Sequence, residues 1–194
     1  MLYEVCSLNK KWQDTEIKKT RMIVNLPEDI LRSRDIPDTI QKILNETKLA
    51  PEYLGIEISE SSTIHKSNDV ELLQTLTNLK EIGIQLSLDN FGTGYSSLYS
   101  LKNLPINVIK IDKTFITNMI NSSEDIAIIR AIIAVAHILG LKVIAEGVET
   151  EKQVLSLLNL GCDTIQGSYL CKPVSDVELA RLIRKKLMIL IPEI

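Results

Sequence analysis

Cysteine and histidine are scarce in this sequence, and their scarcity argues against a zinc protein. The 194 residues include three cysteines and two histidines. These are Cys6, Cys162, Cys171, His65 and His137. None of them shows the paired spacing of a structural zinc site. The odd cysteine count suits a reduced chain, in which buried thiols behave as small apolar side chains.

The sequence also lacks an excess of positive charge and a long hydrophobic run. Lysine and arginine number 22 against 25 acidic residues, so the net charge is −3 and no basic footprint for a nucleic-acid polymer is present. The most apolar segment, 126–141, contains Arg130 and His137 and is too short to span a bilayer. Met1 leads into a mixed polar stretch with no visible signal peptide. We therefore expect a cytoplasmic chain without membrane contact in this segment.

The order of apolar segments predicts an α/β protein. With 45% hydrophobic residues, the chain can bury one core, so we expect a single domain over 1–194. Short apolar runs alternate with segments of helical period. The expected strands are 22–26, 53–58, 84–88, 108–111, 142–145 and 164–166. The expected helices are 1–14, 36–49, 69–82, 96–102, 123–139, 150–160 and 177–189, with Ser123 as the cap of the fifth. This alternation predicts βαβ units and a parallel sheet.

Polar residues close every one of these strands. A single such residue is most simply a turn former or a helix cap. All six strands show the feature, at the end where ligand and catalytic groups collect in parallel α/β barrels and open sheets. The residues are Asn25, Glu57, Glu60, Asp89, Asn90, Lys110, Asp112, Glu146, Glu149 and Gln166. Their oxygens suit a hard divalent cation. With a lysine beside them, they favour hydrolysis of a phosphate ester.

The stretch SLDNFGTGYSSL, 87–98, carries two of these residues and two nearby glycines. It could form a phosphate cradle, a metal-binding loop or only a turn. A dinucleotide fingerprint requires a long helix after its glycines, and the sequence does not predict one here. We therefore interpret the stretch as a metal-site loop, with Asp89 facing the cation and 91–95 forming a mobile turn.

Six motifs resemble those of the EAL-domain phosphodiesterases of bacterial cyclic di-GMP signalling. They are IVNLP, LGIEISES, LDNFGTGYSSL, VIKIDKTF, VIAEGVET and GCDTIQGSYLCKP, and they follow the family's order up to about Pro173. The resemblance implies a TIM-type (β/α) barrel that hydrolyses cyclic di-GMP to linear pGpG with Mg²⁺ or Mn²⁺.

The matching positions imply roles for individual residues. By resemblance, Asn25, Glu57 and Asp89 are metal ligands, and Glu146 is a ligand or general base at a second metal. Lys110 resembles the lysine that holds the attacking water. Glu60 resembles the glutamate that steadies the loop after Asp89. Glu149 and Gln166 resemble residues that line the pocket and position substrate.

Two departures from the family pattern affect the expected activity. The Glu-Ala-Leu strand and the strand before it have no counterpart in the sequence, so the resemblance implies an incomplete barrel of about six strands. Active members usually have aspartate where this chain has Asn90, at a ligand position of the second metal, and a neutral amide holds Mg²⁺ less well. We expect a weakly active or inactive phosphodiesterase domain.

Two alternatives to a phosphodiesterase domain stay open at this point. The chain could be a non-catalytic module that binds cyclic di-GMP or a protein, or a fragment of a longer protein that carries the activity. An incomplete barrel would also have open edges at the strands that contain Val24 and Ile165. Open edges invite pairing, so we expect a homodimer or strand-exchanged oligomer. Otherwise the N-terminal helix or the 187–191 tail would cover the gap.

Overall fold

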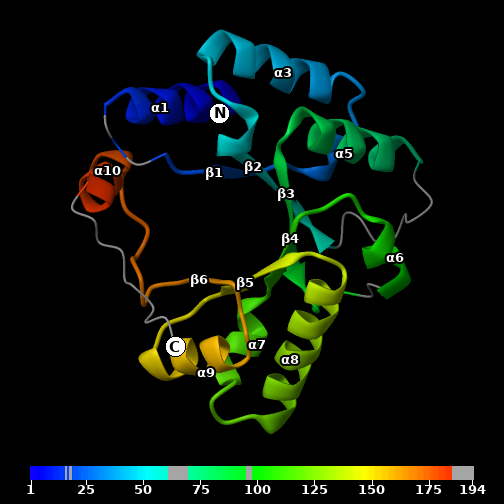
Figure 1. The fold of residues 1–194 in the computed structure, drawn as a ribbon, viewed down its shortest axis with the longest axis vertical. Coiled ribbons are helices and arrows are strands. Elements are labelled where there is room, and N and C mark those ends of the chain that lie inside the picture. The colour runs from blue at the N-terminus through cyan, green and yellow to red at the C-terminus, as the bar shows by residue number, and fades with distance from the viewer. Residues whose placement is uncertain (16, 18, 61–69, 95–97, 185–194) are drawn as a thin grey trace.

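Six parallel strands form one sheet whose spatial order is the order of the chain. The computed structural model describes residues 1–194 except 16, 18, 61–69, 95–97 and 185–194. The order is β1-β2-β3-β4-β5-β6, and every neighbouring pair is parallel. The strands are β1 (Met22–Asn25), β2 (Leu54–Ser59), β3 (Gln85–Phe91), β4 (Val108–Ile111), β5 (Lys142–Glu146) and β6 (Thr164–Gln166). The sheet curls into an incomplete barrel with helices around it (Figure 1), which confirms the predicted fold class.

Helices precede the first strand, connect consecutive strands and follow the last one. They are α1 (Leu2–Asp14), α2 (Glu28–Leu31), α3 (Ile36–Thr47), η1 (Pro51–Tyr53), α5 (Val70–Ile82), α6 (Leu98–Asn103), α7 (Lys113–Asn118), α8 (Ser123–Ile138), α9 (Glu151–Asn159) and α10 (Asp176–Arg184). The sequence pattern missed the short elements α2, η1 and α7. The remaining helices agree with prediction within a few residues where the structure describes them. None of the described helices is long and apolar enough to cross a membrane.

Two local predictions were wrong. The cap of α8 is Ser122, whose side chain accepts from the backbone N–H of Asp125 at 3.0 Å; Ser123 is the first helical residue instead. Strand β3 continues through Asp89 and Asn90 to Phe91, so Phe91 is not part of a turn. Tyr95, the other end of that expected turn, lies outside the described residues.

The core lies between the outer face of the sheet and the helices. In β2, Leu54, Ile56 and Ile58 are fully buried, and the residues between them point into the barrel because side chains alternate along a strand. Helix α1 packs against α3 and β1. Its buried Asn9 donates to the carbonyls of Thr20 at 3.1 Å and of Tyr53 at 2.9 Å. These bonds join the first helix to the segments that precede β1 and β2.

Both outer strands have an unpaired edge within the part of the chain that the structure describes. Strand β1 pairs only with β2, and β6 only with β5, as the sequence predicted. Ile23 in β1 is 40% exposed, and no residue of β6 or α10 is buried. The N-terminal helix lies on α3 and β1, and α10 follows β6 on the open side of the sheet (Figure 1). The predicted cover by 187–191 falls outside the described residues.

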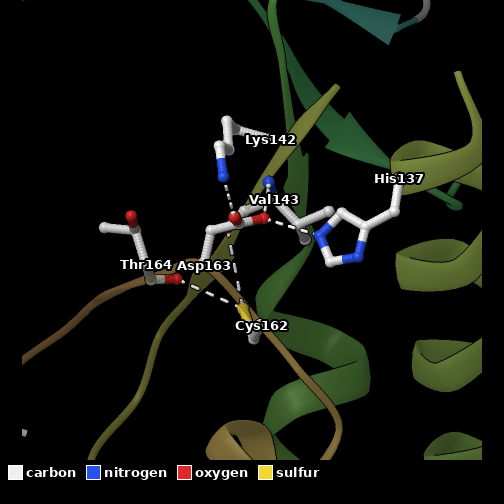
Figure 2. Close-up of polar contacts among 6 residues, drawn as sticks. All are labelled: His137, Lys142, Val143, Cys162, Asp163 and Thr164. Atoms are coloured by element: carbon white, nitrogen blue, oxygen red, sulfur yellow. Dashed lines mark hydrogen bonds and ion pairs between the residues drawn. The ribbon is translucent and has the colours of Figure 1, made fainter. Parts of the chain in front are cut away.

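Asp163 lies at the start of β6, beside the start of β5, and therefore at the opposite end of the sheet from the polar strand ends. Its side chain contacts β5 and α8 (Figure 2). Its carboxylate accepts from the backbone N–H of Val143 at 2.9 Å and lies 2.6 Å from the Lys142 ammonium. It also lies 2.8 Å from Nε2 of His137, at the end of α8. Burial would raise the pKa of Asp163, but the bonds to Lys142, His137 and Val143 outweigh it and lower the pKa. The ionised carboxylate therefore stabilises this corner.

We expect Asp163→Asn to destabilise the fold by about 1 kcal/mol at neutral pH, because the Lys142 ammonium loses its ionic partner and one of the two acceptor oxygens becomes a donor. A lowered pKa contributes stability above the unfolded value of about 3.9, and that contribution is lost as pH falls through the folded value. The difference between wild type and variant should therefore shrink below about pH 4. Urea denaturation at neutral and acidic pH measures this difference. A difference undiminished in acid would contradict the assignment.

Cys162, beside Asp163, is a desolvated thiol. Burial raises its pKa to about 11, and its Sγ lies 3.3 Å from the carbonyl of Thr164. Because the thiolate is the reactive form, we expect iodoacetamide to label the exposed Cys171 at least about tenfold faster than Cys162 near pH 8. Peptide mass spectrometry over a labelling time course checks the order. Equal rates would show that Cys162 is open to solvent.

Candidate active site

Four charged side chains from four consecutive strands meet at the carboxyl end of the sheet. Lys110 of β4 is the centre. Its Nζ lies 2.9 Å from Oε1 of Glu57 on β2, 3.1 Å from Oδ1 of Asp89 on β3, and 3.8 Å from Oε2 of Glu146 on β5. In the parallel register Glu57 is opposite Ser87, two residues before Asp89, and Lys110 is opposite Ile144, two residues before Glu146. The carboxylates therefore converge on Lys110 from different levels of the strands. We call these residues the Lys110 cluster.

The centre of the Lys110 cluster is buried, and the cluster carries excess negative charge. The Lys110 side chain is 3% exposed and that of Glu57 is 9% exposed. Burial alone would lower the pKa of Lys110, but its bond to Glu57 and the charges of Glu57, Asp89 and Glu146 raise it. Desolvation raises the pKa of Glu146, against the opposing effect of Lys110. With all four groups ionised, three carboxylates and one ammonium leave a charge of −2, which a divalent cation would offset.

The end of β3 gives Asp89 and Asn90 an unusual local conformation. The β3–β4 register shifts between Leu88 and Phe91, and Asn90 has a φ of 58°, a left-handed conformation that asparagine adopts more readily than most residues. Its Nδ2 donates to Oδ2 of Asp89 at 3.1 Å. Oδ1 of Asp89 is buried with no hydrogen-bond partner and faces the Lys110 ammonium. The neutral amide thus satisfies one oxygen of Asp89, where a carboxylate would repel it.

Glu60 anchors the backbone that follows Asn90. Its Oε2 accepts from the N–H groups of both Gly92 and Gly94 at 3.0 Å. Glu60 is 1% exposed, and a Cβ at position 94 would lie 3.0 Å from its Cδ. Gly92 has a φ of +98°, and a Cβ there would lie 2.8 Å from Phe115. The sequence GTG therefore allows the loop to close over a buried carboxylate.

The other predicted site residues, Asn25, Glu149 and Gln166, lie on the strands and loops beside the cluster. Asn25 pairs in register with Glu57, and Gln166 pairs in register with Glu146; both are exposed. Glu149 is exposed after β5, and its backbone N–H donates to Oε1 of Gln153 at 2.8 Å. The roles assigned to these residues stay predictions.

Two further polar residues lie near the strand ends, one with a structural role and one that the sequence analysis did not predict. Asp112 caps α7, accepting from the N–H of Thr114 at 2.8 Å, which is a structural role. Ser87 was not predicted: it is fully buried, its Oγ has no hydrogen-bond partner, and it lies on the same face of β3 as Asp89. Its signal in the sequence is a hydroxyl between two leucines of a buried strand.

The donor chemistry suits a hard cation, but the structure does not assemble a metal centre. In the part of the chain that is described, no group of three or more His, Cys, Asp or Glu side chains is arranged to hold a metal ion. The carboxylates of Glu57 and Asp89 instead turn toward Lys110. Oδ1 of Asp89 has no hydrogen-bond partner, and its ion pair with Lys110 is its one described polar contact. The predicted ligand set of Asn25, Glu57, Asp89, Asn90 and Glu146 therefore remains a prediction.

A parallel, curled α/β sheet with acidic groups and a lysine at the carboxyl ends of its strands defines the class as a (β/α) barrel domain, in which functional groups collect at that end of the sheet. Comparison with known proteins gives the family. Residues 1–173 match the EAL domain, and the chain belongs to that family.

The relatives include proteins named for cyclic di-GMP turnover. The chain is 37% identical over 179 residues to the bifunctional diguanylate cyclase/cyclic di-GMP phosphodiesterase MucR of Pseudomonas aeruginosa. This match covers 92% of the chain but only 26% of MucR, so the chain spans about a quarter of that relative's length.

Solved structures agree with the sequence match. The MucR phosphodiesterase in complex with c-di-GMP superposes with a TM-score of 0.86 at 37% identity, covering 92% of this chain and 71% of that one. The EAL domain of Mycobacterium smegmatis DcpA gives a TM-score of 0.88 at 34% identity, covering 95% and 82% respectively. Both neighbours are longer than the segment that this chain matches.

Proposed function

We propose that this chain is a cyclic di-GMP phosphodiesterase domain of reduced activity, which cleaves one phosphodiester bond to give pGpG. The observation that carries the proposal is Lys110 held between Glu57, Asp89 and Glu146 at the carboxyl ends of the strands. Family membership and the c-di-GMP complex of MucR support the substrate.

In this proposal the residues of the Lys110 cluster act on water and on a phosphate ester. Glu57, Asp89 and Asn25 would hold Mg²⁺ or Mn²⁺, with Glu146 and Asn90 beside them. The cation would polarise the phosphoryl group and lower the pKa of water. Lys110, charged because its pKa is raised, donates to the attacking water and holds it in place. Glu146, whose pKa is also raised, accepts the proton.

Two features support reduced activity. Asn90 is neutral and its amide is bonded to Asp89, so the second cation position loses a charge. The open edges of β1 and β6 leave Asn25 and Gln166 exposed, so the substrate side of the site lacks walls that a closed barrel has.

The test is pGpG formation from cyclic di-GMP with Mn²⁺, followed by chromatography. Wild type should give slow but measurable product, and Glu146→Gln should abolish it because the general base is lost. Glu124→Gln is the matched control, since Glu124 is exposed at the start of α8 and the same chemical change there should leave the rate unaltered. No product from wild type at high enzyme concentration would overturn catalysis.

The alternative is a module that binds cyclic di-GMP or a protein without turnover. The hydrogen bond from Asn90 to Asp89 favours this alternative. The bond stabilises the Asp89 carboxylate, so the acidic cluster needs no second cation to remain folded. Calorimetric titration with cyclic di-GMP in Ca²⁺, and again without divalent ions, separates the two. Binding of cyclic di-GMP without product supports the binding module. If the chain neither binds cyclic di-GMP nor forms product, the remaining candidate is a module that binds a protein.

The unpaired edges of β1 and β6 suggest a further part of the proposal, which concerns association with another polypeptide. We propose that β1 and β6 pair with additional polypeptide, through a homodimer or strand exchange, because unpaired edges beside exposed apolar residues such as Ile23 recruit strands. Hydrogen exchange of the β1 and β6 amides should slow with rising protein concentration. Exchange independent of concentration would contradict pairing between copies. A cytoplasmic location, where the second messenger acts, completes the proposal.

A further inference from the structure

A buried amide, that of Gln153, contacts the segment that carries two acidic residues of the site. Gln153 lies in the first turn of α9 and is 5% exposed. The segment that links β5 to α9 contains Glu149 and follows directly after Glu146. A polar side chain is buried at little cost only when its donors and acceptors are paired. The partners of Gln153 therefore show what its burial achieves.

The amide oxygen of Gln153 caps α9. This Oε1 accepts from the N–H of Glu149 at 2.8 Å and from that of Thr150 at 2.9 Å. In return, the hydroxyl of Thr150 accepts from the N–H of Gln153 at 3.3 Å. These bonds form a capping box, in which glutamine and glutamate serve equally well at this position. Capping alone therefore does not require an amide.

The amide nitrogen of Gln153 makes a second contact, which a glutamate could not make. Its Nε2 donates to the carbonyl of Ile116 in α7 at 2.9 Å, through a buried hydrogen bond that joins positions 37 apart in the chain. Helix α7 follows directly after β4, the strand of Lys110. An ionised glutamate has no donor and would set an oxygen against that carbonyl. Gln153 therefore ties the loop after β5 to the helix after β4.

A second close contact joins the same two elements. Gly147 has a φ of +77°, and a Cβ there would lie 2.6 Å from Cβ of Lys113 in the first turn of α7. On the other side of the loop, the N–H of Val148 donates to the carbonyl of Gln166 at 3.0 Å. The loop that follows Glu146 is therefore held between α7 and the end of β6.

We propose that Gln153 is a positioning residue, which fixes Glu146 relative to Lys110 by tying the loop after β5 to α7. Glu146 is the carboxylate of the cluster farthest from the Lys110 ammonium, at 3.8 Å, and its side chain is 29% exposed. The ion pair alone therefore holds it loosely. A small displacement of a proton acceptor slows a reaction strongly. The inference rests on the proposed phosphodiesterase function, in which Glu146 accepts the proton of the attacking water.

Two variants separate the tie to α7 from the cap of α9. Gln153→Glu keeps the acceptor of the capping box and removes the donor to Ile116, and kcat for pGpG formation in Mn²⁺ should fall about tenfold or more. Thr150→Ala removes the hydroxyl of the box and keeps Gln153, so kcat should change less than about twofold although the lost cap lowers the melting temperature. Gln153→Met removes the donor without adding a charge and should lose kcat like Gln153→Glu. Gln74→Glu adds the same charge at an exposed position of α5 and should keep the wild-type kcat.

Hydrogen exchange measures the tie without any turnover. The amides of α7 should exchange about tenfold faster in both Gln153 variants than in wild type, because this short helix loses a buried hydrogen bond. Thr150→Ala and Gln74→Glu should leave the exchange of α7 unchanged. A wild-type kcat in both Gln153 variants, or unchanged exchange of α7 in both, would overturn the inference. If wild type forms no product, the proposed function fails, and the exchange of α7 then decides by itself whether Gln153 ties the two elements.

Discussion

Lys110→Met should destabilise the fold by about 3–5 kcal/mol, because removal of one partner from a buried ionic cluster leaves its carboxylates uncompensated. Lys110 is 3% exposed and lies within 3.1 Å of both Glu57 and Asp89. Methionine resembles the aliphatic stem of lysine and removes the ammonium with its charge and its hydrogen-bond donors. Chemical denaturation in metal-free buffer measures the loss.

Two controls separate charge from packing. Lys102→Met removes the same charge from an exposed position on α6 and should change stability by less than about 0.5 kcal/mol. Adding Mn²⁺ should recover part of the loss in the Lys110 variant, since a cation can take over the compensation of the carboxylates. If Lys110→Met is no less stable than the Lys102 variant, the charges of the cluster are not buried as the structure has them.

Asn90→Asp should increase the rate of pGpG formation in Mn²⁺ by about tenfold or more, because a charged oxygen returns to the second cation position. The same change should lower stability by about 1 kcal/mol in metal-free buffer, because the bond from Asn90 to Asp89 becomes a repulsion between carboxylates. Aspartate tolerates the positive φ of this position. Assays of pGpG measure the effect on rate, and thermal unfolding measures the effect on stability, each with and without Mn²⁺.

Asn90→Ala is the matched control, since it removes the amide without adding a charge. It should also lose stability, through the lost hydrogen bond and the strain of alanine at a φ of 58°, but it should gain no activity and no extra stabilisation by Mn²⁺. A gain in rate in both variants would point to release of Asp89 as the cause. A gain in neither would contradict the role of position 90 as a ligand.

The sequence allowed the sheet to be predicted well because the signals are local and repeated. Runs such as VIKI and KVIAE are short, apolar and followed by turn residues, so all six strands were found in order. The short helices α2 and α7 were missed, because neither is long enough to show a helical period. The cap of α8 was predicted at Ser123 and is Ser122. The two adjacent serines have the same capping chemistry, so only the backbone geometry distinguishes them.

The sequence indicated which polar side chains stand at the strand ends, and it did not indicate how they contact one another. Strand-end position identified Glu57, Asp89, Lys110 and Glu146, because parallel strands bring such positions to one edge. That Lys110 is the shared partner of the three carboxylates depends on side-chain directions. The contact of Asn90 with Asp89 depends on a shift in the register between β3 and β4. No pattern in the sequence predicted this shift.

The most direct measurement compares pGpG formation by wild type and Asn90→Asp with Mn²⁺, at enzyme concentrations high enough to detect a single turnover. If Asn90 limits the activity of a phosphodiesterase site, wild type should form pGpG slowly and Asn90→Asp should form it about tenfold faster or more. Absence of product from both proteins, with both folded and binding cyclic di-GMP, would contradict catalysis by the Lys110 cluster and leave the chain a binding module.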